Sequence, residues 1–163
     1  LTRIWWVADW ICRSAPPRRV RRSSGRAVVF ATTVDPPHKA ALRSAEVLRR
    51  AVALEGHDVL FTHGDPLYLD KARRFPGRGF VVGADALVRM LDPRWGVDVT
   101  SLVTELRALG AHFYVVPRLI DGSLVSLDDI RAMDGLGRAL ETLSAEGVDG
   151  RWDVSSSAIR AAR

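Results

Sequence analysis

Residues 79–91 read Gly-Phe-Val-Val-Gly-Ala-Asp-Ala-Leu-Val-Arg-Met-Leu and join a buried strand to a helix. Three consecutive apolar residues, 80–82, are typical of a strand covered on both faces, as in a parallel sheet. Gly83 ends the strand, and from Ala84 the apolar residues recur at helical spacing. A strand that turns directly into a helix predicts a parallel α/β sheet, with Asp85 in the first helical turn.

Two interpretations of this turn are open. In open parallel sheets small ligands bind at the carboxyl ends of strands, where glycine lets the backbone come close and a helix amino terminus offers free N–H groups. The Asp85 carboxylate would then accept a hydrogen bond from a ligand hydroxyl. Alternatively, Gly83 only makes a tight turn and Asp85 only complements the helix dipole.

Strands and helices alternate along the rest of the chain. Further strands are expected at 27–33, 58–62 and 111–116, which are rich in β-branched, aromatic and small residues. Helices are expected at about 42–55, 67–72, 84–91, 99–109 and 127–143, and a hairpin turn at 120–124. With 163 residues, 47% of them apolar, the chain suits one core. The prediction is a single α/β domain with a Rossmann-like parallel sheet and helices on both faces.

The basic charge of the chain is concentrated at its start. Residues 1–26 carry seven Arg and one Asp, a net charge of +6, whereas the remaining residues carry 17 basic and 18 acidic side chains. Three Trp beside these cations are compatible with a membrane-surface or nucleic-acid anchor. The favoured interpretation is a disordered leader, or the remnant of a sheet whose first strand is missing, with the domain at 27–163. Binding to nucleic acid is not expected, because the folded part is not basic.

Composition also limits the compartment and the chemistry. Cys12 is the only cysteine, so the chain forms no internal disulfide and no thiolate metal cluster. Asp9 and Arg13 interrupt the one apolar run that approaches a membrane span. We therefore expect a cytoplasmic protein without a membrane partner.

Polar side chains follow each predicted strand. They are Asp35, His38, His63, Asp65, Asp85 and Arg118. The carboxyl ends of parallel strands meet at one edge of the sheet, so these residues are expected to line one crevice. Ser155, Ser156 and Ser157 open the last predicted helix, and their hydroxyl and N–H groups, with Arg160, suit a phosphate. The same serines could instead serve only as a helix cap.

Two of these segments resemble a known family. Residues 154–160, Val-Ser-Ser-Ser-Ala-Ile-Arg, resemble the Ile-Ser-Ser-Thr-x-Ile-Arg signature of the nucleotidylyltransferases that include nicotinamide and nicotinate mononucleotide adenylyltransferases. Residues 82–85, Val-Gly-Ala-Asp, are similar to the Gly-Ala-Asp segment of that family. The resemblance covers about residues 27–163. It implies that Gly83, Ala84 and Asp85 contact ATP, that the serine–arginine motif holds its phosphates, and that Arg118 belongs to the same nucleotide site.

The implied reaction is adenylyl transfer from ATP, with Mg²⁺, to a phosphate-bearing acceptor such as nicotinamide or nicotinate mononucleotide, with release of pyrophosphate. The catalytic loop of the family reads Gly-x-Phe-[Asp/Asn]-Pro-x-His-x-Gly-His. Asp35, Pro36 and His38 match it, which makes His38 the catalytic candidate, but Ala40 and Ala41 stand where the family has Gly and the second His.

A second alignment assigns residues 30–50 to the second strand and helix of long bacterial members of the family. The catalytic first strand would then lie upstream and be missing. We favour this truncated alignment over a degenerate catalytic loop. Both leave the alternative that the chain is a non-catalytic nucleotide-binding module.

Overall fold

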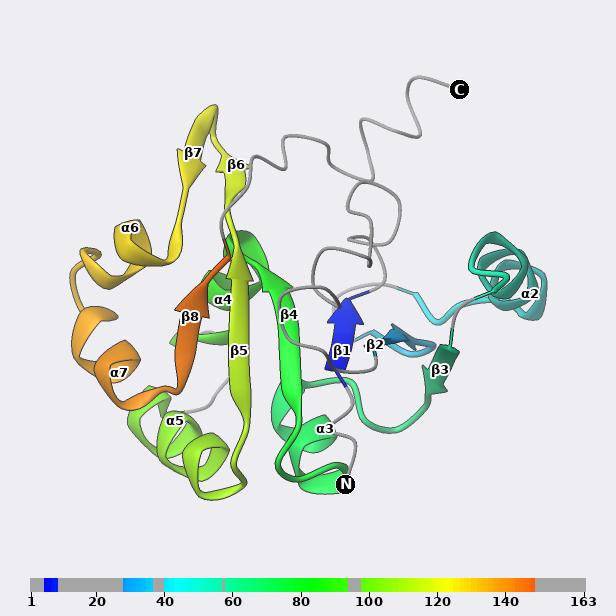
Figure 1. Ribbon diagram of the computed structural model, residues 1–163, viewed down its shortest axis with the longest axis horizontal. Helices are drawn as coiled ribbons and strands as arrows, with labels where there is room; N and C mark the ends of the chain where they lie inside the picture. Colours follow the sequence, from blue (N-terminus) through cyan, green and yellow to red (C-terminus); the bar gives the residue numbers. More distant parts are fainter. Residues whose placement is uncertain (1–4, 9–27, 37–39, 57, 94–97, 149–163) are drawn as a thin grey trace.

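The computed structural model describes residues 5–8, 28–36, 40–56, 58–93 and 98–148. The strands are β1 Trp5–Ala8, β2 Val28–Thr33, β3 Asp58–Thr62, β4 Gly79–Gly83, β5 His112–Val116, β6 Arg118–Ile120, β7 Ser123–Val125 and β8 Ala145–Gly147. The helices are α2 Ser44–Ala53, α3 Tyr68–Arg74, α4 Ala84–Met90, α5 Val99–Ala108, α6 Leu127–Arg131 and α7 Gly137–Thr142. Six strands form a parallel sheet in the order β3-β2-β1-β4-β5-β8, and β6 and β7 form an antiparallel hairpin (Figure 1).

The strand β1 lies inside the sheet and corrects the predicted domain boundary. Trp5 pairs with Val28 of β2 on one side and with Gly79 of β4 on the other. The prediction that the domain begins at residue 27 is therefore wrong for Trp5–Ala8. The truncated alignment assigned the first-strand position to an upstream segment, but here a strand of this chain occupies the sheet between β2 and β4. The aromatic residues of this run are common in strands, but the arginine cluster that follows them in the sequence favoured a leader instead.

The other predicted strands are confirmed as β2, β3, β4 and β5, and the hairpin is confirmed as β6–β7. The helix predicted at 127–143 is instead two short helices, α6 and α7. Gly135 lies between them with φ 82, a left-handed conformation that ends a helix. The edge strand β8 was not predicted, because Ala145-Glu146-Gly147 has no β-branched or aromatic residue to signal it.

The main core lies on one face of the sheet. Because side chains alternate along a strand, Phe80 and Val82 share a face, and both belong to a buried cluster with residues of α3, α4, α5, α6 and α7. Phe80 stacks on Phe113 at a ring distance of 5.3 Å, and Tyr68 of α3 meets both rings edge-on at 5.9 and 6.0 Å. These aromatic contacts fasten α3 to the centre of the sheet.

The helix α2 belongs to the other face. Along the strand order, the connections that contain α3, α5, and α6 with α7 all lead towards β8. The connection through α2 leads from β2 to β3, in the opposite direction. Right-handed crossovers place α2 on the opposite face from the others. None of its residues is buried, and Leu48 and Val52 are 66% and 64% exposed. Of the helices predicted on both faces, α3 to α7 pack on one face of the sheet. The helix α2 lies near β3 at one end of the sheet and buries no residue (Figure 1). No helix in the described part of the chain has the length and apolarity to cross a membrane.

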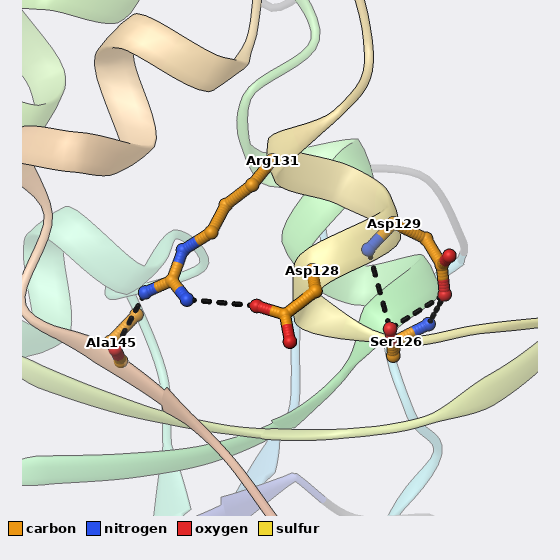
Figure 2. Close-up of polar contacts among 5 residues, drawn as sticks. All are labelled: Ser126, Asp128, Asp129, Arg131 and Ala145. Carbon is orange, nitrogen blue, oxygen red and sulfur yellow. Dashed lines mark hydrogen bonds and ion pairs between the residues drawn. The ribbon is translucent and has the colours of Figure 1, made fainter.

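A reciprocal cap starts α6 (Figure 2). The Ser126 hydroxyl donates to Asp129 Oδ2 at 2.6 Å and accepts from the Asp129 N–H at 3.3 Å, while the Ser126 N–H donates to the same carboxylate at 2.7 Å. At the other end of α6, Arg131 binds Asp128 Oδ1 at 3.0 Å and the Ala145 carbonyl at 3.2 Å. These contacts join α6 to β8.

We predict that Ser126→Ala lowers the free energy of unfolding by about 1 kcal/mol, because the helix loses its cap. The Ser126 hydroxyl, and secondly its N–H, hold the pKa of Asp129 below its usual 3.8. A lowered carboxyl pKa stabilises the fold above the ordinary carboxyl pKa and this contribution is lost as the pH falls. The deficit of the variant in urea denaturation should therefore shrink below about pH 4. Ser123→Ala, at an exposed position in β7, is the matched control, and an equal deficit in both variants would contradict the cap.

Candidate functional site

The strand order places the candidate site near β1. The chain runs outward from β1 to β3, returns to β4 and continues to β8, so the direction of strand addition reverses between β1 and β4. In open parallel sheets ligands bind outside the carboxyl ends of strands at such a reversal. Polar residues of the described chain gather there in two groups, one after β4 and β5 and one after β2 and β3.

The first group pairs Asp85 with Arg118. Asp85 lies in the first turn of α4, and Arg118, 7% exposed, follows β5. Arg118 Nε lies 3.6 Å from Asp85 Oδ1, while Arg89 Nη2 lies 3.2 Å from Asp85 Oδ2. Burial lowers the pKa of Arg118, and the Asp85 carboxylate opposes this effect. The pair is thus a charge contact at the boundary of the core.

Asp85 retains unused hydrogen-bonding capacity in this arrangement. Its Oδ1 atom is buried and has no hydrogen-bond partner, because 3.6 Å to Arg118 is an ionic contact and too long for a hydrogen bond. Tyr68 lies nearby: burial, and secondly the charge of Asp85, raise the pKa of its hydroxyl, which therefore stays neutral. Asp85 Oδ1 can accept a hydrogen bond from a ligand that reaches it.

The backbone at Gly83 bears on the two interpretations of this turn. Gly83 has φ −80 and ψ 154, an extended conformation that any residue adopts, so the turn does not need glycine for its angles. Gly83 is itself buried. The backbone angles therefore leave both interpretations of this turn open.

The second group is built around Asp35, which follows β2. Asp35 Oδ2 accepts from the Gly64 N–H at 2.9 Å and lies 4.0 Å from His63 Nε2. The Gly64 N–H is the largest cause that lowers the pKa of Asp35. Asp35 is therefore ionised at neutral pH, and its Oδ2 atom is held by the loop that follows β3.

Lys71 joins this group from α3 and is 6% exposed. Its Nζ atom donates to the carbonyl oxygens of Asp65 at 2.6 Å and Pro66 at 3.3 Å. Burial lowers the pKa of Lys71 from 10.5 to about 8, against the opposing charge of Asp65 and other carboxylates. The sequence predicted that Lys71 lies in a helix, but it did not predict Lys71 as a site residue. Its spacing of three from Tyr68 and its place beside Ala72 were the available signal of an inward-facing position.

The predicted site residues fall into two sets. Gly83, Ala84, Asp85 and Arg118 come together at the carboxyl ends of β4 and β5. His38, Ser155, Ser156, Ser157 and Arg160 lie outside the described residues. Within the described ranges no group of three His, Cys, Asp or Glu side chains is arranged to hold a metal. The Mg²⁺ expected with ATP stays a prediction.

Comparison with protein-family models, with curated proteins and with solved structures found no match for this chain. The resemblance to nucleotidylyltransferases therefore stays a prediction from the motif residues. One of its two motifs, residues 82–85, lies in the described part of the chain, and the other, residues 154–160, lies outside it.

We predict that Lys71 makes stability rise with pH. Because its pKa falls from 10.5 unfolded to about 8 folded, the unfolded state binds more protons between these values, and folding becomes more favourable as pH increases across them. Relative to Lys71→Met, the wild-type free energy of unfolding should increase by roughly 3 kcal/mol from pH 7.5 to pH 10.5. Urea denaturation of both proteins across this range measures it. A difference that does not change with pH would show that Lys71 titrates normally.

Proposed function

We propose that the chain binds ATP at the carboxyl ends of β4 and β5 and transfers its adenylyl group to a phosphate-bearing acceptor such as nicotinamide or nicotinate mononucleotide, releasing pyrophosphate. The observation that carries this proposal is the contact between Asp85 and the buried Arg118, 3.6 Å apart, beside the reversal of strand order. The order β3-β2-β1-β4-β5-β8 supports a Rossmann-like fold, whose strands follow the same order. The proposal includes a cytoplasmic location, where ATP is available.

The two side chains suit different parts of a nucleotide. Asp85 Oδ1, a buried acceptor without a partner, can accept from an amino or hydroxyl group of the nucleoside. Arg118 stays protonated in proteins despite a lowered pKa, and a cation in a partly dry environment attracts phosphate strongly. Ser155, Ser156, Ser157 and Arg160 complete the proposal as ligands of the remaining phosphates.

The proposed reaction requires little covalent participation by the protein. A phosphate oxygen of the acceptor attacks the α-phosphorus of Mg-ATP, the bond from that phosphorus to the bridging oxygen breaks, and pyrophosphate leaves with the bond electrons. Positioning of the two substrates and neutralisation of the phosphate charge supply most of the rate. His38 is the candidate that would stabilise the transferring phosphate.

Nucleotide binding without transfer is the second candidate function. Ala40 and Ala41 replace the glycine and the second histidine of the family loop, and residues 9–27, which follow β1, contain no histidine. If β1 is the first strand of the family sheet, the paired histidines are missing from the position where the family has them. This observation favours a binding module that has lost catalysis.

Pyrophosphate release separates the two functions. With Mg-ATP and either mononucleotide, we expect release above a no-enzyme control, and loss of it in the double variant Asp85→Asn with Arg160→Ala, because the nucleotide loses one acceptor and one cation. A folded chain that binds ATP without releasing pyrophosphate would leave the binding module as its function. Failure to bind ATP would exclude both.

Arg160 provides a test that does not depend on catalysis. We predict that Arg160→Ala weakens ATP binding about ten-fold, because a charge-assisted hydrogen bond to phosphate is lost. Arg107→Ala is the matched control, since it removes the same charge from an exposed position on α5. Titration calorimetry at constant salt measures both. Equal affinities in the two variants would remove Arg160 from the site.

A further inference from the structure

Two buried oxygen atoms at the carboxyl ends of β2 and β3 have no hydrogen-bond partner. They are Asp35 Oδ1 and Thr62 Oγ1, and Thr62 as a whole is 4% exposed. A buried polar atom without a partner costs free energy, and in native proteins it usually indicates a bound water or ligand. Neither atom takes part in the ATP contacts proposed above.

Two hydrogen bonds join the segments that carry these side chains. The Val34 N–H donates to the Thr62 carbonyl at 2.9 Å, and the Gly64 N–H donates to Asp35 Oδ2 at 2.9 Å. The segments that leave β2 and β3 are therefore fastened to each other. With Oδ2 occupied, Oδ1 is the acceptor that Asp35 keeps for another molecule.

Lys71 adds a donor beside these acceptors. An ammonium group carries three N–H donors, and two of them go to the carbonyl oxygens of Asp65 and Pro66. Lys71 and Asp35 are near enough that each charge shifts the pKa of the other. The group thus presents a carboxylate oxygen, a hydroxyl and one remaining ammonium hydrogen.

This combination suits sugar hydroxyl groups. Each hydroxyl both donates and accepts, so a vicinal pair can donate to Asp35 and accept from Lys71. A phosphate alone is repelled by the Asp35 carboxylate, and the Lys71 ammonium disfavours a metal cation in the same place. An acidic side chain near the second strand of a 3-2-1-4-5-6 sheet is also where dinucleotide-binding folds hold a ribose hydroxyl.

We propose that Asp35, Thr62 and Lys71 bind the ribose hydroxyl groups of the acceptor. This inference rests on the proposed function. Only β1 separates β2 from β4, so the acceptor ribose and the ATP site lie on opposite sides of the strand-order reversal. The acceptor phosphate then points across the carboxyl end of β1 towards ATP.

Two isosteric variants test the site. In Asp35→Asn the amide oxygen still accepts from Gly64, but an NH₂ group replaces the acceptor Oδ1. Nicotinamide mononucleotide should bind at least ten-fold more weakly to it, with ATP affinity unchanged. Thr62→Val replaces the unpartnered hydroxyl by a methyl group, so it should raise the melting temperature of the free chain and weaken nicotinamide mononucleotide binding several-fold. A purely structural role would not produce these opposite effects.

Asp128→Asn is the matched control, because Asp128 is exposed on α6 and contacts Arg131. Wild-type protein should bind ribose 5-phosphate several-fold more tightly than 2-deoxyribose 5-phosphate. Three results would overturn the inference and leave an ordered water in the site. The first is equal binding of the two sugars, and the second is unchanged nicotinamide mononucleotide binding in Asp35→Asn and Thr62→Val. The third is a chain that binds ATP but none of these three probes. Asp35-dependent binding of nicotinamide mononucleotide by a chain that does not bind ATP would overturn the proposed function alone.

Discussion

Backbone pairing on both sides of β1 is the constraint on which the rest of the structure depends. This four-residue strand joins β2–β3 to β4–β5–β8, and the connections cross the sheet in opposite directions on its two sides. Because parallel strands share one carboxyl edge, the residues that follow β2 and those that follow β4 lie on either side of β1. Asp35 and Asp85 thus face a common edge although 50 positions separate them in the sequence.

The sequence was sufficient to predict those elements whose structure depends only on neighbouring residues. The apolar run Phe80–Val82 and the spacing from Ala84 onwards predicted β4 and α4, because burial on both faces and helical amphipathicity are properties of a few neighbouring residues. The same reasoning failed for β1 and β8. Their strand structure depends on pairing partners far along the chain, and Ala145–Gly147 has no intrinsic preference for a strand.

The candidate site was predictable only in part, for a related reason. The position of Asp85 and Arg118 after strands indicated their common edge, but the burial of Arg118 and the free Oδ1 of Asp85 follow from packing between elements. Lys71 and Thr62 were not predicted as site residues, because lysine on a helix is normally solvated and threonine at a strand end is common. In the fold both side chains are buried, and Lys71 lies on α3, which packs on the sheet through Tyr68.

The contact of Arg131 with Ala145 has a consequence for how the sheet meets other proteins. Ser144 and Val148 direct their backbone hydrogen bonds to β5, so by alternation the carbonyl of Ala145 faces outward from the edge strand β8. Arg131 occupies that carbonyl, which an incoming strand would need. A strand added at this edge would therefore find one of its backbone acceptors already in use.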